Sequence, residues 1–278
     1  MKQIQGDVIK SVRTVSNYEQ SLSKLGDWAK YHNHGDLRTM TPQTATAYLD
    51  ERSEYVSQST LDMDRQAIQA MMVHVTHELS PNNTLPRIIS ELELSQSSRA
   101  YTSDQIHLIS NSQSDRHSLS TEIAHSAGLR AHELITIQPI QDAPPDKRPA
   151  LESKFDGRDG ERYTVTGKGG LTREIVIPNT LVQRLEEQKF NIPQKITDRG
   201  IHYKQYYDIG AGQRWSNSFS AASNRALGWS NGGHGLRHSY AQERMGELTN
   251  NMQRSKALET VSQEMGHFRP EITEVYLR

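Results

Sequence analysis

The stretch HGLRHSYAQERM, residues 234–245, places His234 three residues before Arg237 in a segment with helical spacing. Side chains three residues apart on a helix lie on the same face, so the imidazole and the guanidinium would point the same way. Histidine exchanges a proton near neutral pH, whereas arginine keeps its charge and offers a planar fork of donors. The pair is therefore suited to proton transfer beside an anion.

The segment MGHFRPEITEVYLR, residues 265–278, contains His267 and, nine residues later, Tyr276. A tyrosine so near the end of a chain is usually a packing residue. Its phenol also becomes a nucleophile when a base or neighbouring cations help to remove its proton. Both roles remain open until the motifs before residue 234 are considered.

Two basic motifs precede this region. SAGLRAHEL carries Arg130 within a stretch, 118–137, that we predict to be helical. Further on, RYTVTG (162–167) and LTREIVIP (171–178) alternate apolar and polar residues around a glycine-rich turn, which predicts a β-hairpin with Lys168 at its tip. Taken singly, each motif is usually structural: a surface ion pair, a solvated lysine, a polar helix face or a packed tyrosine.

The order of the motifs carries more information than any one of them. Along the chain they give Arg130, Lys168, His234, Arg237, His267 and Tyr276. This series resembles the signature of the tyrosine recombinases, the phage-integrase family. That signature runs arginine, hairpin lysine, His-x-x-Arg, histidine or tryptophan, and a nucleophilic tyrosine.

The local contexts resemble the family as well. It writes its first two boxes as T-G-L-R-x-x-E-L and H-D-L-R-H-T-F-A, which SAGLRAHEL and HGLRHSYA match in part. Its third box is L-G-H before a tyrosine at this same offset, often with a threonine three residues before that tyrosine, as Thr273 is here. The resemblance is specific over residues 104–276 and rests only on helical character before residue 80.

The resemblance implies a division of roles at a DNA phosphodiester. Arg130 and Arg237 would clamp the non-bridging oxygens of the transition state, with His267 as a further donor. Glu133, three residues after Arg130, would hold the first guanidinium in a structural or a functional role. His234 is the candidate general acid–base group.

The covalent step is implied by the same resemblance. Tyr276 would attack the phosphorus, and Lys168 would deliver a proton to the leaving 5′-hydroxyl. The product would be a 3′-phosphotyrosyl enzyme that preserves the bond energy for rejoining. The two arginines would stabilise the charge that Mg²⁺ stabilises in other phosphoryl transfers, so we expect no cofactor and no metal ion.

Two features depart from the family pattern. The spacing of thirty residues from Arg237 to His267 predicts a small insertion in GELTNNMQRSKA. Many members also continue past the tyrosine into a tail that packs on a neighbouring subunit, whereas only Leu277 and Arg278 follow it here. Either such a tail is dispensable, or protomers contact each other elsewhere, or this chain has been shortened.

Apolar spacing predicts the organisation of the chain. Three helices are expected within 16–32, 41–56 and 59–79, and SPNNTLP then interrupts the pattern. Further helices are expected around the hairpin, with a less regular region at 191–212. The predicted fold class is mostly α with a small antiparallel β-sheet (α+β). The resemblance to the tyrosine recombinases implies the domains: a helical core-binding (SAM-like) DNA-binding domain at 1–80, a linker at 81–103 and a tyrosine recombinase catalytic domain at 104–278.

Composition limits the classes of protein that fit. The chain has no cysteine, which excludes disulfides, thiolate metal sites and cysteine nucleophiles. No apolar run approaches the length of a membrane span, and nothing at the N-terminus has the form of a signal peptide. The net charge is −1, with nine Lys/Arg against twelve Asp/Glu up to residue 95 and 23 against 21 after it. A protein that binds DNA must therefore gather its positive charge on one face.

Other signals are weaker. His74 and His77 have helical spacing but no evident third ligand, so a helix face is favoured over a zinc site. His238 is expected either to support the site or to pack. The stretch HYKQYYDIGAGQRWSN, residues 202–217, mixes tyrosines with Lys204 and Arg214, and is equally consistent with a DNA-backbone surface or a packed loop.

The resemblance therefore implies a site-specific DNA recombinase or integrase, acting in integration or excision of a mobile element. The resemblance implies a partner as well: double-stranded DNA carrying specific sites, bound by a homo-tetramer with possible DNA-bending accessory proteins and no membrane. The expected location is cytoplasmic, with the protein nucleoid-associated when it is bound to DNA. The alternatives are a non-catalytic DNA-binding accessory protein with this fold and a type IB-like topoisomerase.

Overall fold

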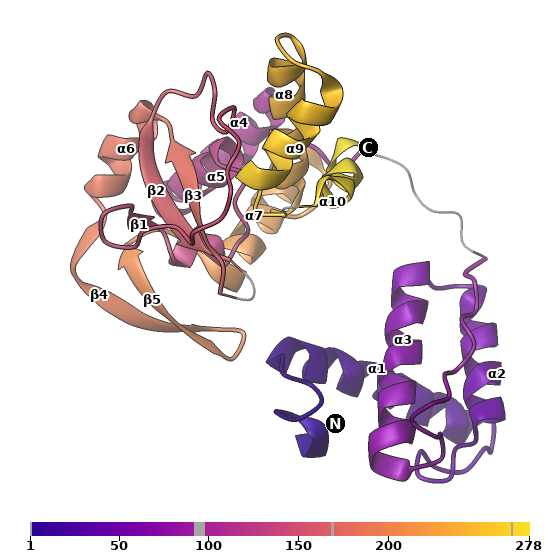
Figure 1. The fold of residues 1–278 in the computed structure, drawn as a ribbon. Coiled ribbons are helices and arrows are strands. Elements are labelled where there is room, and N and C mark those ends of the chain that lie inside the picture. Colours follow the sequence, from indigo (N-terminus) through magenta and orange to yellow (C-terminus); the bar gives the residue numbers. More distant parts are fainter. Residues whose placement is uncertain (1, 92–97, 168–169, 268) are drawn as a thin grey trace. The chain divides into compact units, whose positions relative to one another are not determined.

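The chain folds into two compact units, shown in Figure 1 as a computed structural model. They comprise Met1–Ser95 and Gln96–Arg278 and are called unit 1 and unit 2. The structure describes residues 2–91, 98–167, 170–267 and 269–278. Each unit has its own apolar core.

Unit 1 is helical. Leu25, Leu49 and Ile68 come from its three long helices and are completely buried in one core. A buried ion pair, Arg52 to Asp64 at 2.8 Å, joins the second helix to the third. Its elements are η1 (Lys2–Ile4), α1 (Val12–Tyr31), α2 (Pro42–Ser53), α3 (Gln58–Met71) and η2 (Met72–Thr76).

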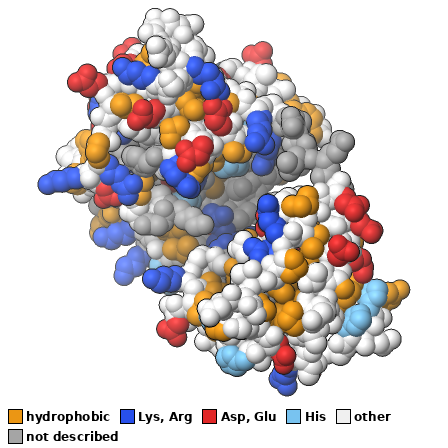
Figure 2. Space-filling view, turned by 45° about the vertical axis from the view of Figure 1, so that its right-hand side comes forward, with side chains coloured by type: hydrophobic (Ala, Val, Ile, Leu, Met, Phe, Trp, Pro, Cys, Tyr) orange, Lys and Arg blue, Asp and Glu red, His pale blue; other side chains and the backbone are white. Residues whose placement is uncertain are grey.

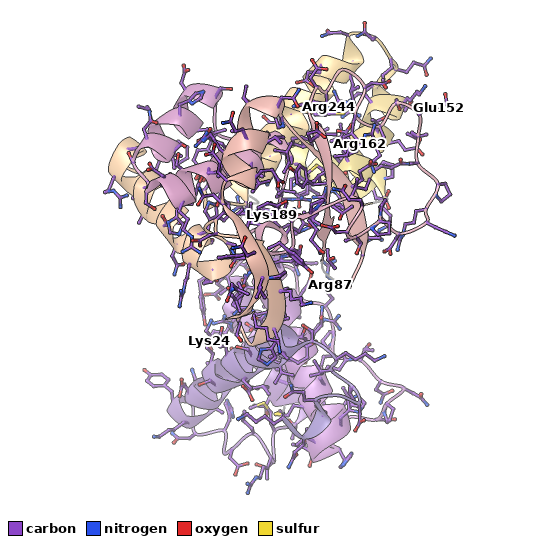
Figure 3. The ribbon with its side chains drawn as sticks, turned by 90° about the vertical axis from the view of Figure 1, so that its left-hand side faces the viewer. Lys24, Arg87, Glu152, Arg162, Lys189 and Arg244 are labelled. Atoms are coloured by element: carbon purple, nitrogen blue, oxygen red, sulfur yellow. The ribbon has the colours of Figure 1, made fainter. Side chains whose placement is uncertain are left out.

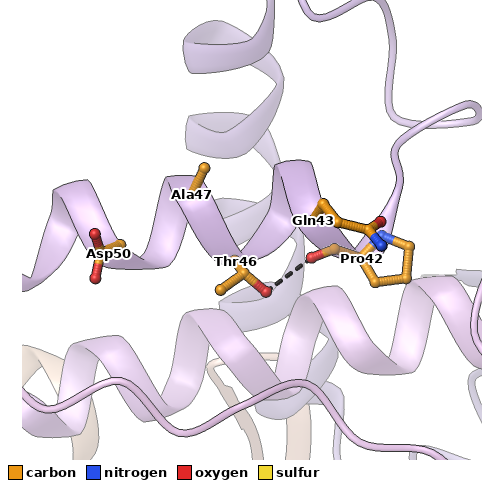
Figure 4. A pocket seen from close by; sticks show the side chains of 5 residues that line it. All are labelled: Pro42, Gln43, Thr46, Ala47 and Asp50. Carbon is orange, nitrogen blue, oxygen red and sulfur yellow. Dashed lines mark hydrogen bonds between the residues drawn. The ribbon is translucent and has the colours of Figure 1, made fainter.

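The prediction of three helices in unit 1 is confirmed. Thr41 caps α2 by accepting a hydrogen bond from the main-chain N–H of Thr44, as its place before Pro42 indicates. A shallow hollow follows the exposed side of α2, where the hydroxyl of Thr46 donates to the carbonyl of Pro42 at 2.8 Å (Figure 4). Its lining includes Asp50 but no cation, so it does not complement a phosphate backbone.

Unit 2 combines helices with two small antiparallel sheets. The first sheet has the order β1-β2-β3, and the second pairs β4 with β5. Its first helices and strands are α4 (Ser103–Asn111), α5 (Asp115–Ser126), η3 (Glu133–Ile135), β1 (Gln138–Pro139), β2 (Glu161–Thr166) and β3 (Thr172–Ile177). They are followed by α6 (Asn179–Glu186), β4 (Lys189–Asp198), β5 (Ile201–Tyr207), α7 (Gly212–Leu227), α8 (Gly235–Thr249), α9 (Arg254–Glu264), α10 (Pro270–Glu274) and η4 (Val275–Leu277).

The core of unit 2 lies between the three-stranded sheet and its helices. Alternate strand residues such as Val165 and Ile175 are buried there, together with Ile123 of α5 and Phe219 of α7. Figure 1 shows α8, α9 and α10 gathered on one side of this unit, away from α6. The C-terminal helices therefore form a separate layer beside the sheet, and the candidate site lies where they meet α5 and β3.

Two local predictions were wrong. The region 191–212 is not irregular, because most of it belongs to the hairpin β4–β5. The helix predicted over 118–137 ends at Ser126, because Gly128 takes the left-handed conformation (φ +59°) and breaks the hydrogen-bond ladder. Arg130 therefore lies in a turn between α5 and η3.

The surface and the helices show two further features. Positive and negative side chains are mixed over the face shown in Figure 2, which agrees with the near-neutral net charge. Within the described ranges, none of the helices has both the length and the apolar character needed to cross a membrane.

Candidate active site

Arg130 is held by the carboxylate of Glu133. The main-chain N–H of Arg130 donates to Oε2 of Glu133 and its Nη1 donates to Oε1, both at 2.8 Å. The turn after Gly128 produces this double contact by placing η3 directly after the arginine. Glu133 is fully buried, whereas 27% of the Arg130 side chain is exposed. The guanidinium is therefore fixed at one end and accessible at the other.

Arg173 is a second partner of Glu133, and the sequence analysis missed it. It lies on β3, it is 3% exposed, and its Nη2 donates to Oε2 of Glu133 at 2.9 Å. Its Nη1 donates to the carbonyl of Glu264, the last residue of α9, at 2.6 Å. A single buried side chain thus joins the β2–β3 hairpin to the Arg130 turn and to the segment that leads to His267.

The signal for Arg173 was present in the sequence. Arg173, Ile175 and Ile177 are two residues apart and therefore face the same side of β3, and the two isoleucines are buried. A charged residue in phase with a buried apolar face requires a buried partner. The sequence does not show which carboxylate that partner is, because Glu133 lies forty residues earlier.

Arg237 is completely buried on the first turn of α8. Its Nη1 donates to the carbonyl of Gly128, and its Nη2 lies 3.2 Å from the carbonyl of Met265 and 2.8 Å from Nε2 of His267. Its Nε has no hydrogen-bond partner among the described residues. Burial, together with the nearby Arg130, lowers the pKa of Arg237 to about 10, so it remains charged at neutral pH.

These contacts determine the protonation of Glu133. Burial alone would favour the neutral acid, but Arg173, Arg237 and Arg130 together outweigh it and hold the pKa of Glu133 well below its usual range. Glu133 is therefore ionised at neutral pH. Its one negative charge leaves the cluster of three guanidiniums with a net positive charge, which favours an anionic ligand.

His267 is oriented from both ring nitrogens. Because Nε2 lies 2.8 Å from a guanidinium, it accepts, so the ring proton is on Nδ1, which donates to Oγ1 of Thr273 at 2.9 Å. Burial and the charge of Arg237 lower the pKa of His267 to about 3. His267 is therefore neutral at pH 7 and has a single orientation.

Tyr276 lies on η4 among these groups. Its ring centre is 5.0 Å from that of His267 and 5.4 Å from that of His234, and Cζ of Arg237 lies 5.5 Å from the ring centre. The ring is also 4.7 Å from His238. Tyr276 is 9% exposed, so the tyrosine is packed within the site and not frayed at the end of the chain.

His234 and His238 complete the surroundings of the tyrosine. His234 occupies the position just before α8 and is exposed, whereas His238 is buried one turn further on. Partial desolvation and Arg237 lower the pKa of His234 to about 4, and burial and Arg99 lower that of His238 to about 4. Both rings are neutral at pH 7, so His234 has a lone pair that can accept a proton, although its lowered pKa makes it a weaker base than an ordinary histidine.

The structure therefore brings together five of the six predicted site residues, and the sixth, Lys168, is not among the described residues. Arg130, His234, Arg237, His267 and Tyr276 converge from α5–η3, α8 and the segment after α9, with a sequence separation of 146 residues between the first and the last. The hairpin predicted around Lys168 is confirmed on both sides, with six residue pairs in register from Glu161–Ile177 to Thr166–Thr172.

Comparison with known proteins gives the fold. No family model and no curated protein matches the sequence. Among solved structures, the XerH site-specific recombinase bound to its difH substrate is 17% identical, covering 95% of this chain and 75% of that one at a TM-score of 0.60. The Tn1549 transposon integrase with transposon right end DNA is 15% identical (100% and 92% covered, TM-score 0.61), and a lambda integrase dimer on a core site is 16% identical (100% and 92%, 0.59).

The chain has the tyrosine recombinase fold. The predicted fold class is confirmed, with the addition of a second small sheet. The family resemblance predicted the arginines, the histidines and the tyrosine that lie together here, and their catalytic roles stay a prediction. It did not identify Arg99, whose Nη2 donates to the carbonyl of Asn231 at 3.0 Å and which adds positive charge beside His234.

Proposed function

We propose that this protein is a site-specific DNA recombinase that cleaves and rejoins DNA through a covalent 3′-phosphotyrosyl intermediate at Tyr276. Its role would be the integration or excision of a mobile element. The observation that carries the proposal is the convergence of Arg237, His234 and His267 on one tyrosine ring. The structural relatives are a recombinase and integrases in complexes with DNA, which supports DNA as the substrate.

The proposed reaction uses these groups in one displacement. The phenol of Tyr276 gives its proton to His234, its oxygen bonds to the phosphorus, and the bond from phosphorus to the 5′-oxygen breaks. The leaving 5′-oxygen takes up a proton, for which Lys168 is the proposed donor. Arg130 and the unpartnered Nε of Arg237 would stabilise the charge on the non-bridging oxygens.

Strand exchange follows from reversal of this step. A 5′-hydroxyl from another strand attacks the phosphotyrosine, and the phenol leaves with its proton restored. The bond energy is kept throughout, which agrees with the expectation that no cofactor is needed. Because each cleaved strand needs its own tyrosine, we also propose a homo-tetramer on two DNA sites, with DNA-bending accessory proteins as possible further partners.

The test is covalent capture. Wild-type protein and Tyr276→Phe are incubated with a diverse pool of DNA fragments, and protein-linked DNA is recovered after SDS and sequenced. Wild type should give adducts at one short inverted repeat, and Tyr276→Phe should give none. Tyr31→Phe is the matched control, because Tyr31 is the most exposed of the described tyrosines at 84% and should leave the adducts unchanged.

Other outcomes favour the alternatives. Adducts scattered without site preference, together with relaxation of supercoils by a single copy, would favour a topoisomerase of the same chemistry. DNA binding without adducts would favour a non-catalytic accessory protein. Adducts that persist in Tyr276→Phe would move the nucleophile to another residue and overturn the proposed mechanism.

A further inference from the structure

The hairpin β4–β5 contributes no residue to the proposed reaction. Figure 1 shows it extending from the unit beyond the three-stranded sheet, and Figure 3 labels Lys189, where β4 begins. Its strands pair in register from Gln194–Gln205 to Asp198–Ile201. They form a separate two-stranded sheet, and within the described ranges neither outer edge has a strand partner.

One face of the hairpin is fastened to the body of unit 2. The side-chain amide of Gln205 holds the end of β5 by donating to the carbonyls of Tyr207 and Ile209, both at 2.8 Å. Just after it, the main-chain N–H of Gly210 donates to the carbonyl of Arg116 in α5 at 3.1 Å. At the other end, the carboxylate of Asp198 accepts from the main-chain N–H of Gln213 in the first turn of α7 at 2.7 Å. These contacts fix which side chains face inward.

The opposite face is exposed and basic. Lys195 and Lys204 are directly paired across the strands, and Thr197 pairs with His202, whose Nδ1 lies 2.9 Å from the threonine hydroxyl. All four are exposed. We call this set the outer face. Like charges directly opposite each other in a sheet are destabilising, so the Lys195–Lys204 pair opposes folding of the hairpin.

The charge of the hairpin is also unusual for this chain. Residues 189–207 contain four Lys/Arg and one Asp, whereas the whole chain has a net charge of −1. The single acid, Asp198, lies at 2.9 Å from Arg199 and at the start of α7, so it is not on the outer face. Arg199 pairs with Asp198, and Lys189 pairs with Glu186 at 3.7 Å. The excess positive charge therefore lies at Lys195 and Lys204 of the outer face.

We propose that the outer face of β4–β5 binds the phosphate backbone of a DNA duplex at a place separate from the catalytic pocket. A phosphate between Lys195 and Lys204 would turn their repulsion into attraction, because each ammonium then has an opposite charge beside it. The inference rests on the proposed function, which makes DNA the polyanion that this protein meets. It also selects the backbone-surface interpretation of the segment 202–217, in which Lys204 lies.

The test uses the full chain and a labelled duplex of random sequence as the probe. The affinity of wild type and of Lys195→Gln/Lys204→Gln is measured over a range of salt concentrations. The slope of log K against log salt should fall in magnitude by about 2 in the double variant, because each phosphate contact contributes about 0.9. The variant should also melt at a higher temperature than wild type, because the repulsion is gone.

Two controls separate binding from structure. Lys195→Arg/Lys204→Arg keeps both charges and should keep the slope. Lys256→Gln removes one exposed charge from α9 and should leave unchanged the contribution of Lys195 and Lys204 to the salt slope. A simple loss of folding would lower the melting temperature and would therefore be recognised.

Several outcomes would overturn the proposal. One is an unchanged slope in the glutamine variant while the Tyr276 adduct still forms, which would leave the recombinase function standing. Another is self-association of the variant without loss of DNA affinity. That result would mean that the lysines prevent the open strand edges from pairing with another copy of the chain. No binding of the duplex by wild type also contradicts it. A reduced slope without any Tyr276 adduct would support DNA binding by the outer face and contradict the proposed recombinase function.

Discussion

The carboxylate of Glu133 is shared by three arginines, and this sharing sets the behaviour of single residues in the site. Arg130 and Arg173 bind it directly, and Nη1 of Arg237 lies 4.0 Å from it. Removing one partner of a buried ion pair costs more than the pair itself contributes, because the remaining charge stays buried. Stability and catalysis should therefore respond together at these positions.

Arg173→Met tests this reasoning. We expect the free energy of unfolding to fall by about 3 kcal/mol or more, because Glu133 and the carbonyl of Glu264 both lose a donor. Urea denaturation followed by circular dichroism measures it. Arg162→Met is the matched control on the adjacent strand, since Arg162 forms an exposed pair with Glu174 at 2.7 Å and should cost under about 1 kcal/mol. Equal losses in the two variants would contradict a special role for Arg173.

The phosphate-binding role proposed for Arg130 gives a second residue-level prediction. Arg130→Gln should slow formation of the Tyr276 adduct roughly a hundredfold, because one preorganised donor to the developing charge is lost. The rate is measured by quenching the reaction in SDS at successive times. A variant that folds, binds DNA and reacts at the wild-type rate would remove Arg130 from the mechanism.

The histidines predict how stability depends on pH. The pKa values of His267 and His238 are lowered in the folded protein to about 3 and about 4, whereas unfolded histidine titrates at about 6.5. Between these values the unfolded chain binds more protons, so the free energy of unfolding should fall as the pH drops below about 6.5. Each histidine contributes up to about 1.4 kcal/mol per pH unit in this window. Urea unfolding at pH 6.5, 5.5 and 4.5 should show a smaller slope for His267→Gln than for wild type, and equal slopes would refute the assignment.

At the scale of elements, the turn after α9 determines where His267 lies. Gly266 has φ +73°, and a Cβ there would come within 2.6 Å of the Arg173 side chain. The glycine is thus required both by its own conformation and by the arginine beneath it. This turn connects the buried ion pairs to the histidine that contacts Arg237.

A glycine-to-alanine pair separates the two requirements. Gly157 has the same φ of +73° but nothing within 4 Å of its Cβ position. Gly157→Ala should therefore cost only about 1 kcal/mol of stability, whereas Gly266→Ala should cost an additional 1–3 kcal/mol, roughly, and slow the adduct. Thermal unfolding and the SDS assay measure these effects. Similar losses in both variants would show that the contact with Arg173 is relaxed easily.

Some elements were predictable from the sequence, and others were not, for physical reasons. The β2–β3 hairpin has apolar alternation on one buried face and glycines at its turn, so its pattern is visible. The β4–β5 hairpin has an exposed face and carries Pro193 within β4, which argues against a strand in a sequence-based prediction. The end of α5 was missed because an isolated glycine does not reveal whether it will take a positive φ.

The site was more predictable than the support around it. The order of the motifs predicted Arg130, His234, Arg237, His267 and Tyr276 as one site, and the structure brings these five residues together, while their catalytic roles stay a prediction. Their mutual orientation depends on contacts between distant segments, such as Arg173 with Glu264, which are ninety-one residues apart. No local pattern contains that information, so the supporting ion pairs became visible only in the fold.

At the scale of the whole molecule, the two units have separate cores and should unfold separately. Leu49→Ala removes a completely buried side chain from unit 1 and should destabilise that unit by about 2–5 kcal/mol. Hydrogen exchange measured by mass spectrometry should then speed up in α1, α2 and α3 and stay unchanged in α5, α7 and α8. Faster exchange in both units would show that their stabilities are coupled.

The shared carboxylate of Glu133 also has a consequence for natural sequence variation. An acid that neutralises several buried cations cannot be replaced alone, since every replacement would leave those cations unpaired. Among descendants of this chain, changes at position 133 should therefore occur together with changes at positions 130 or 173. We expect these three positions to covary as one inherited unit, although position 133 lies forty residues before position 173.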